Sequence, residues 1–265
     1  KADSFSVKHD MGSNTTPSKE PSVGATPAPT FSPLYRQIKS LLMQRLESGE
    51  WRPGEAIPSE SELALRFSVS QGTVRKAIDE MAAEHLLVRR QGKGTFVATH
   101  SDPRSFYRFL RLMSNDGKAM QAVSDPFFCE TIGATEDVAG ALGLQAGDRV
   151  IHVKRLLRFN GEPVVFDQIF LVADLFSGLT LEALRGGERS LYSLFETDFG
   201  VRMIHAEEHL RAVAADSQSA ELLGVDQGAP LLLVERTAYT YGNKPVEWRL
   251  GLYCTRHHYY RNDLG

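Results

Sequence analysis

The sequence holds one pattern of metal-site type, His205-x-x-Glu208-His209, which matches the H-x-x-E-H motif of inverted zinc proteases. That chemistry requires both histidines on one face of a helix. In residues 201–209, however, successive residues alternate between a more apolar and a more polar side, which is typical of a β-strand. No third ligand lies at a fitting distance along the sequence, so we expect no metal, no catalytic residue and no cofactor.

A second stretch, residues 68–78 (SVSQGTVRKAI), sets small polar residues and cations at the front of a predicted helix. A helix N-terminus presents free backbone N–H groups and the positive end of the helix dipole, and both favour a phosphate. Small side chains at Ser70 and Gly72 let the backbone approach closely, and Arg75, one turn further on, can reach a phosphate or a base edge. These residue types suit nucleic-acid binding.

Two helices are expected to lead up to this stretch. The first spans residues 33–48, with Pro33 at its start and Gly49 as its stop. The second opens at Ser59, which forms a capping box with Glu62.

A third helix and a hairpin should complete the unit. Ser70 caps the helix over residues 70–84, and apolar alternation on both sides of residues 91–94 (QGKG) predicts a β-hairpin with a basic, glycine-rich tip. Helix, short turn, helix and basic hairpin together predict a winged helix-turn-helix, whose last helix enters the major groove of DNA.

Residues 31–98 resemble the winged-helix domain of the GntR family of bacterial transcription regulators, through the stretches PLYRQIKSLL and GEWRPGEAIPSESELALRFSVSQGTVRKAIDEMAAEHLLVRRQGKGTFV. The resemblance implies base recognition by the third helix and the wing. The family usually has an arginine at the position of Ser61 and often one at Gln71. The residues expected to bind DNA are Ser59, Ser70, Gln71, Gly72, Thr73, Arg75, Lys76, Arg89, Arg90, Gly92, Lys93, Gly94 and Thr95.

Charge is divided unevenly along the chain. The net charge is −3, but residues 31–100 carry +2 and residues 101–265 carry −5. A basic segment on an acidic body permits DNA binding and disfavours a DNA-compacting structural protein. Cys129 and Cys254 follow no metal or disulfide pattern and are expected to be free thiols. No apolar run approaches the ~20 residues of a membrane helix, so we expect no membrane association and a cytoplasmic protein.

The rest of the chain predicts a tail, a linker and a second domain. Residues 1–30 contain Pro17, Pro21, Pro27 and Pro29 among Ser, Thr and Ala, which predicts a disordered tail. Residues 1–10, before Met11, are expected not to belong to the native protein. The polar segment 99–104 is the predicted linker. Residues 105–262 are the predicted second domain of an α+β chain, which we expect to bind the effector and to mediate dimerisation.

That second domain contains an internal repeat. Residues 141–164 and 222–246 match at an offset of 81, which pairs Gly143 with Gly224 and Arg155 with Arg236. Each copy predicts a helix, a turn, an apolar strand, a tight hairpin and a second strand. The two copies suggest a pseudo-symmetric antiparallel sheet with helices outside.

Residues 105–262 resemble the UTRA ligand-sensing domain of the HutC branch of the same family, which shares the chorismate-lyase fold. The resemblance implies a six-stranded antiparallel sheet and a pocket for a small metabolite. Relatives that bind phosphorylated amino sugars hold the anion with an Arg-x-Arg pair, of which this chain keeps Arg155 and has Leu157 at the second position. The residues expected to bind the effector are Arg155, Asp167, Ser190, Glu247 and Tyr253.

Arg155 also needs a partner for reasons independent of the resemblance. It lies between apolar residues in VIHVKRLL, and a half-buried guanidinium requires an anion. Two partners remain open at this point, the carboxylate of Asp167 on the facing strand or a bound ligand.

From these features we expect a homodimeric, ligand-responsive transcription regulator. It would act as a repressor on a palindromic double-stranded DNA operator and be released by a small anionic metabolite, either a carboxylate or a phosphorylated compound. The alternative hypothesis is a chorismate-lyase-like enzyme tethered to a DNA-binding module.

Overall fold

The computed structural model describes residues 32–101, 111–116, 122–186 and 189–262. The predicted tail 1–30 and residues 102–104 of the predicted linker lie outside these ranges. Residues Leu34–Gly265 form one compact unit. The boundaries expected at 98 and 105 therefore stay a prediction. We use the names winged-helix region for Leu34–Val97 and sheet region for residues 122–262.

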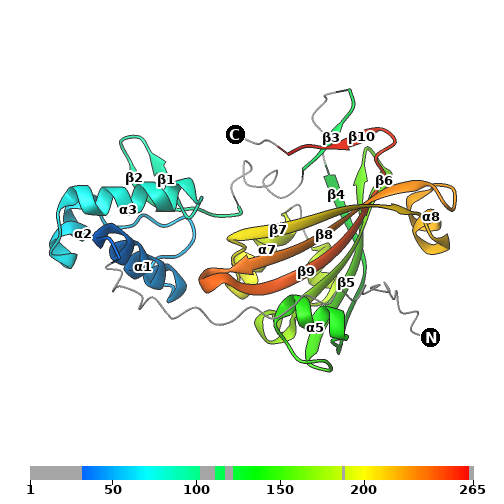
Figure 1. Ribbon diagram of the computed structural model, residues 1–265, viewed down its shortest axis with the longest axis horizontal. Helices are drawn as coiled ribbons and strands as arrows, with labels where there is room; N and C mark the ends of the chain where they lie inside the picture. The colour runs from blue at the N-terminus through cyan, green and yellow to red at the C-terminus, as the bar shows by residue number, and fades with distance from the viewer. Residues whose placement is uncertain (1–31, 102–110, 117–121, 187–188, 263–265) are drawn as a thin grey trace, which may run out of the picture. The chain divides into compact units, whose positions relative to one another are not determined.

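The winged-helix region contains three helices and a hairpin, in the predicted order (Figure 1). They are α1 Leu34–Glu47, α2 Glu60–Phe67, α3 Gln71–Ala83, β1 Leu87–Arg90 and β2 Gly94–Val97. The predicted caps are confirmed, since Ser59 and Glu62 form a capping box at α2 and the Ser70 side chain accepts a hydrogen bond from the backbone of Thr73 at α3. Apolar residues of all three helices and both strands share one core.

The sheet region is built on six antiparallel strands in the order β4-β5-β6-β9-β8-β7, which confirms the predicted sheet (Figure 1). Their bounds are β4 Ala122–Gly133, β5 Arg149–Phe159, β6 Glu162–Val172, β9 Lys244–Tyr253, β8 Pro230–Thr240 and β7 His205–Ala214. A separate two-stranded sheet pairs β3 Leu112–Ser114 with β10 His258–Tyr260.

The internal repeat is a structural repeat. Helix α5 (Glu136–Leu142) precedes the β5–β6 hairpin, and α8 (Ser217–Leu223) precedes the β8–β9 hairpin. Each helix ends at a glycine in the left-handed conformation, Gly143 with φ 65° and Gly224 with φ 64°, which costs glycine little because it has no Cβ. Strands β6 and β9 meet at the centre, so the two copies lie on opposite halves of one sheet.

The two faces of the sheet have different coverings. Helices α5 and α8 pack on one face, against clusters that include Val150, Phe170 and Leu156. The other face packs against η1 (Ala173–Phe176), α6 (Leu181–Arg185) and α7 (Leu191–Phe199) around Phe176 and Phe195. Because side chains alternate along a strand, Arg155 shares this second face with Ile151 and Val153, which belong to the α7 cluster.

Within the described residues, no helix is long and apolar enough to cross a membrane.

Candidate functional site

The first candidate site is the start of α3 together with the wing between β1 and β2. Ser59 and Ser70, both expected to contact DNA, serve as N-caps, and the Ser70 Oγ accepts from the Thr73 backbone N–H at 3.1 Å. Gln71 and Gly72 follow as the first residues of α3 and are exposed. The helix thus presents small polar side chains and backbone N–H groups at its N-terminus, where an anion is favoured.

The cations of this site already have anionic neighbours. The Nε of Arg75 donates to Glu60 Oε2 at 2.9 Å, and Arg89 Nη2 lies 3.1 Å from Glu60 Oε1 and 2.6 Å from Asp79 Oδ1. The Arg75 and Arg89 side chains remain 56% and 44% exposed. Exposed pairs of this kind contribute only about 0–1 kcal/mol, so these guanidinium groups can exchange a carboxylate for a phosphate at little cost.

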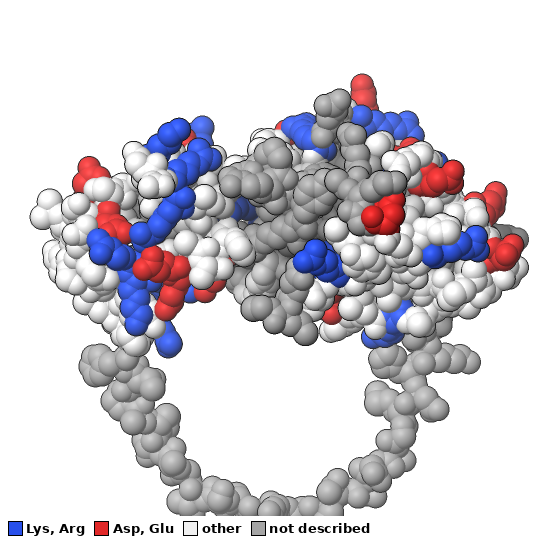
Figure 2. Space-filling model, turned by 90° about the horizontal axis from the view of Figure 1, so that it is seen from above, with Lys and Arg blue, Asp and Glu red and all other residues white. Residues whose placement is uncertain are grey.

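Two further cations rest on aromatic rings. Lys76 Nζ lies 4.0 Å from the centre of the Tyr35 ring, and the guanidinium carbon of Arg90 lies 4.6 Å from that of Phe96. Figure 2 shows blue side chains gathered over the winged-helix region, with red ones among them.

The wing tip carries Lys93 between two glycines. Gly92 and Gly94 have φ of 69° and 106°, values that side chains with a Cβ rarely adopt, and Lys93 and Thr95 complete the turn and its return strand. Lys93 is exposed, so its ammonium group is presented at the end of the hairpin.

The second candidate site is a cluster of buried charges on the α7 face of the sheet. Arg155 on β5 and Asp167 on β6 are direct cross-strand partners, and the Arg155 Nη2 and Nε atoms lie 2.8 and 2.9 Å from Asp167 Oδ2. The Arg155 side chain is 9% exposed and that of Asp167 is fully buried. The sequence left two partners open for Arg155, a ligand or the carboxylate of Asp167. The structure shows the Asp167 carboxylate, so the charge of Arg155 is balanced without a ligand.

Arg249 on β9 joins one further acid, Glu247, to this pair. Its Nη2 lies 2.8 Å from Glu247 Oε1 and its Nη1 3.5 Å from Asp167 Oδ2. Glu247 Oε1 also accepts a hydrogen bond from the Tyr192 hydroxyl at 3.0 Å. The cluster therefore spans β5, β6, β9 and, through Tyr192, helix α7.

Arg236 on β8 belongs to the same cluster: burial lowers its pKa, but Tyr192, Glu247 and other neighbours raise it overall. Its Nε donates to Glu208 Oε1 on β7 at 2.6 Å, and the Tyr260 hydroxyl of β10 donates to the other Glu208 oxygen. Three arginines and three carboxylates thus face one another, and their formal charges balance. Buried charges persist in proteins when they are paired in this way.

Burial shapes the protonation of this cluster. Burial raises the pKa of Tyr253 to about 12 and also raises the pKa of Tyr192, because both phenols lie away from water near carboxylates. Both tyrosines are therefore hydrogen-bond donors at neutral pH. Burial opposes the charged form of Arg249, but Glu247, Tyr192 and Asp167 together raise its pKa overall, so it stays a cation.

The cluster leaves three polar atoms without a hydrogen-bond partner among the described residues. They are Asp167 Oδ1, Glu247 Oε2 and Arg249 Nε. Buried polar atoms are nearly always bonded, to protein, water or a ligand. Two acceptors and one donor are thus available to a water molecule or a ligand.

The backbone at Gly251 makes room for these groups. An added Cβ there would lie 2.6 Å from the Tyr253 ring and 2.9 Å from Asp167 Oδ1, well inside van der Waals contact. Both of these expected effector residues therefore lie directly against Gly251.

Four of the five expected effector residues lie in or beside the cluster, namely Arg155, Asp167, Glu247 and Tyr253. The fifth, Ser190, is the N-cap of α7, and its Oγ accepts from the Ser193 backbone N–H at 3.1 Å. Sequence reasoning missed five other members of the cluster, namely Tyr192, Glu208, Arg236, Arg249 and Tyr260. A signal existed for two of them, since Arg236 is the repeat counterpart of Arg155 and Arg249 falls on that of Asp167 after the one-residue slip of the second copy.

The H-x-x-E-H pattern lies on strand β7, as its alternation predicts. His205 Nε2 is 2.5 Å from Asn243 Oδ1, while Glu208 belongs to the buried cluster. No group of three potential metal ligands occurs among the described residues.

Family models and relatives agree on what the chain is. Residues 34–97 match the model of the bacterial regulatory proteins of the gntR family, and residues 128–259 match the UTRA domain. The chain is 29% identical to the histidine utilization repressor of Pseudomonas putida over 81% of its own length and 85% of that protein. It is also 29% identical to the repressor NagR of Bacillus subtilis, over 83% and 90%.

Solved structures agree with these matches. The ligand-binding domain of a GntR-family transcriptional regulator from Bordetella bronchiseptica aligns with a TM-score of 0.59 and 47% identity, over 60% of this chain and 99% of that one. The regulator YydK of Bacillus subtilis shares the fold, with a TM-score of 0.54 and 18% identity over 88% and 99%. These relatives are named as transcription regulators rather than enzymes. The chain belongs to the GntR family of bacterial regulatory proteins and joins a winged helix-turn-helix to a UTRA domain.

Proposed function

We propose that this regulator is a cytoplasmic homodimeric repressor that binds a palindromic operator and releases it when a small metabolite enters the buried charge cluster. The DNA contacts come from the start of α3 and from the wing. One winged helix covers one half-site, so a two-fold dimer supplies the affinity and specificity that a single module lacks. Two of the named relatives are repressors, which supports this direction of control.

One observation supports the effector site: three buried polar atoms in the cluster have no hydrogen-bond partner in the part of the chain that the structure describes. The cluster is balanced in charge, so a doubly charged phosphate ester would add two uncompensated charges, whereas a carboxylate adds one and a zwitterion none. We therefore favour a metabolite with one carboxylate for the Arg249 Nε and with hydrogen-bond donors for Asp167 and Glu247. A phosphorylated compound is the second choice.

The DNA part of the proposal is tested by selecting operator duplexes in vitro with the wild-type protein and then measuring variants on them. Arg75→Ala should lower operator affinity by about 5- to 150-fold, the effect of losing a contact worth ~1–3 kcal/mol. Lys93→Ala should weaken binding to every sequence and reduce the salt slope by about one unit. Arg149→Ala, an exposed arginine of the sheet region, is the matched control and should bind as wild type. Unchanged binding in both test variants would refute the assigned DNA face.

The effector part is tested by a thermal-shift screen of carboxylates, amino acids and sugar phosphates. A ligand at ~100 times its dissociation constant adds about 2.7 kcal/mol of stability. A hit whose shift persists in Arg249→Lys and Glu247→Gln proteins would place the effector outside the cluster.

A further inference from the structure

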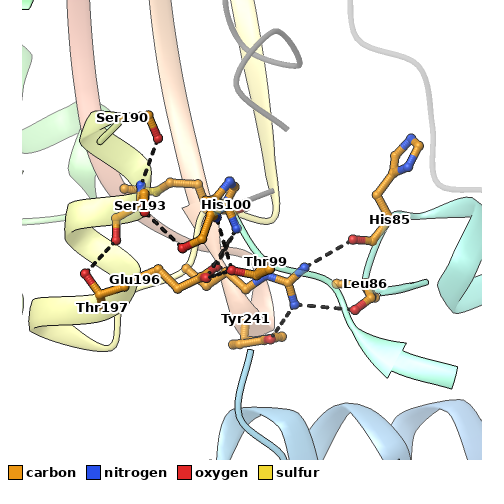
Figure 3. A network of polar contacts seen from close by, with 12 residues as sticks. His85, Leu86, Thr99, His100, Ser190, Ser193, Glu196, Thr197 and Tyr241 are labelled. Carbon is orange, nitrogen blue, oxygen red and sulfur yellow. Dashed lines mark hydrogen bonds and ion pairs between the residues drawn. The ribbon is translucent and has the colours of Figure 1, made fainter. Parts of the chain in front are cut away.

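Helix α7 contacts the buried charge cluster near its start and, through its middle, the segment that follows the winged-helix region. Near its start, Tyr192 donates its hydroxyl hydrogen to Glu247. One turn later Glu196, with a side chain only 3% exposed, points toward the segment that leaves the wing (Figure 3). The two residues are four apart, so they lie on the same side of α7.

Glu196 binds the start of the segment between the two regions. Both of its carboxylate oxygens accept the backbone N–H of His100, at 3.1 and 3.2 Å, and Oε1 also accepts the Thr99 hydroxyl (Figure 3). The His100 ring is bonded in turn to the Met203 carbonyl at 2.9 Å. Three residues after Val97, the chain is thus fixed to the sheet region by charge-assisted bonds, which are stronger than neutral ones.

Arg202 continues the network into the winged-helix region. Its Nη2 donates to the His85 carbonyl at 3.2 Å and its Nη1 to the Leu86 carbonyl at 3.4 Å, while its Nε lies 3.7 Å from Glu196 Oε2 (Figure 3). His85 and Leu86 directly follow the C-terminal end of α3, where a cation is favoured. Arg202 therefore holds the end of the recognition helix opposite to the end that faces DNA.

The Glu196–Arg202 pair has the properties of a positioning device. Its side chains are 3% and 4% exposed, so the desolvation of two charges opposes the pair, and it persists only if its geometry is kept. Separating the two groups would leave each charge buried without its partner, so the pair resists a change of arrangement.

We propose that Glu196 and Arg202 are specificity-determining residues for operator spacing: they lock α3 to the sheet region and so fix the separation of the two half-sites that a dimer accepts. This inference rests on the proposed DNA binding by a dimer, with the two chains held together through their sheet regions. Because Tyr192 and Glu196 share α7, a molecule that displaces Tyr192 from Glu247 would act on the same lock.

The test uses full-length protein and operator duplexes selected in vitro with the wild type, in which the spacer between half-sites is lengthened or shortened by a few base pairs. Wild-type protein should discriminate against altered spacers. Glu196→Gln keeps the side-chain shape but loses the charge, and it should lose about tenfold of that discrimination while binding a single half-site as wild type does. Glu221→Gln, on exposed α8, is the matched control.

A second variant guards against misfolding. Thr99→Val removes one donor to Glu196 and leaves the ion pair, so it should lose a smaller part of the discrimination. Hydrogen exchange of the free protein gives an independent readout, because the His100 amide should exchange faster in Glu196→Gln.

Wild-type spacing preference and wild-type exchange in both variants would overturn the inference and leave the proposed function standing. If the wild-type protein selects no duplex with two half-sites, the proposed function itself fails, and the inference fails with it.

Discussion

The arginines of the winged-helix region and those of the sheet region have opposite surroundings. The Arg75 and Arg89 side chains are 56% and 44% exposed and pair with carboxylates at the surface, whereas those of Arg155 and Arg249 are 9% and 6% exposed. An exposed pair contributes little, so it can be given up for a phosphate. A buried pair cannot be broken cheaply, so a ligand must replace each contact that it displaces.

The largest expected effect is a loss of stability when the buried ion pairs of the sheet region are broken. Arg249→Met should destabilise the protein by about 3–5 kcal/mol, because Glu247 and Asp167 are left buried without their shared cation. Urea denaturation followed by circular dichroism gives the free energy of unfolding. Arg75→Met, the exposed counterpart, should change it by less than about 0.5 kcal/mol. Equal effects of the two substitutions would remove the distinction between the regions.

A smaller loss of stability is expected when a side chain is introduced at Gly251. Gly251→Ala should cost about 1–3 kcal/mol, because the new Cβ would overlap the Tyr253 ring and Asp167 Oδ1. The matched control is Gly140→Ala inside α5, where nothing lies within 4 Å and alanine should stabilise the helix by up to about 1 kcal/mol. A neutral Gly251→Ala would show that the cluster repacks freely.

The two exposed arginines of the winged-helix region, Arg75 and Arg89, share one anion, Glu60, whose charge can be removed. Glu60→Gln should raise affinity for DNA by up to about fivefold, because Arg75 and Arg89 lose a competitor of the phosphates. Fluorescence anisotropy on a labelled duplex measures this, with Glu55→Gln as a control in the same region. A drop in affinity would mean that Glu60 orients Arg75 rather than competing for it.

A pH-dependent effect is expected from a half-buried titratable group on the opposite face of the sheet. His152 stacks on Phe170 at 4.3 Å, and burial with nearby Lys154 lowers its pKa from 6.5 to about 4. The unfolded chain therefore binds more protons than the folded one between these values. The contribution of neutral His152 to stability is complete above pH 6.5 and is lost as pH falls toward 4.

The pH-dependent contribution of His152 is measured as the difference in unfolding free energy between pH 7.5 and pH 5. In His152→Gln protein that difference should shrink, since the substituted side chain does not titrate. His205→Gln is the control, because His205 is bonded to Asn243 near the surface. In this variant the free-energy difference should stay close to that of the wild type.

Local features of the structure could be predicted because their causes lie close together in the sequence. Ser59, Glu62 and Ser70 cap helices within three residues of themselves, and the alternation around His205 identifies a strand wherever that strand packs. Asp167 could be predicted as a cross-strand partner of Arg155, because both lie on one hairpin and the turn of a hairpin determines its register.

The sequence alone determined the elements of the winged-helix region, their order, the repeat and the family. The tertiary structure decided which charges meet. Strand β9 lies beside β6 only because two distant hairpins join at the centre of the sheet, and that step brings Arg249 to Asp167, 82 residues apart. Arg202 reaches the Leu86 carbonyl across 116 residues. Periodicity and capping act over a few residues, so no local pattern marks such partners, and only the packing of whole elements selects them.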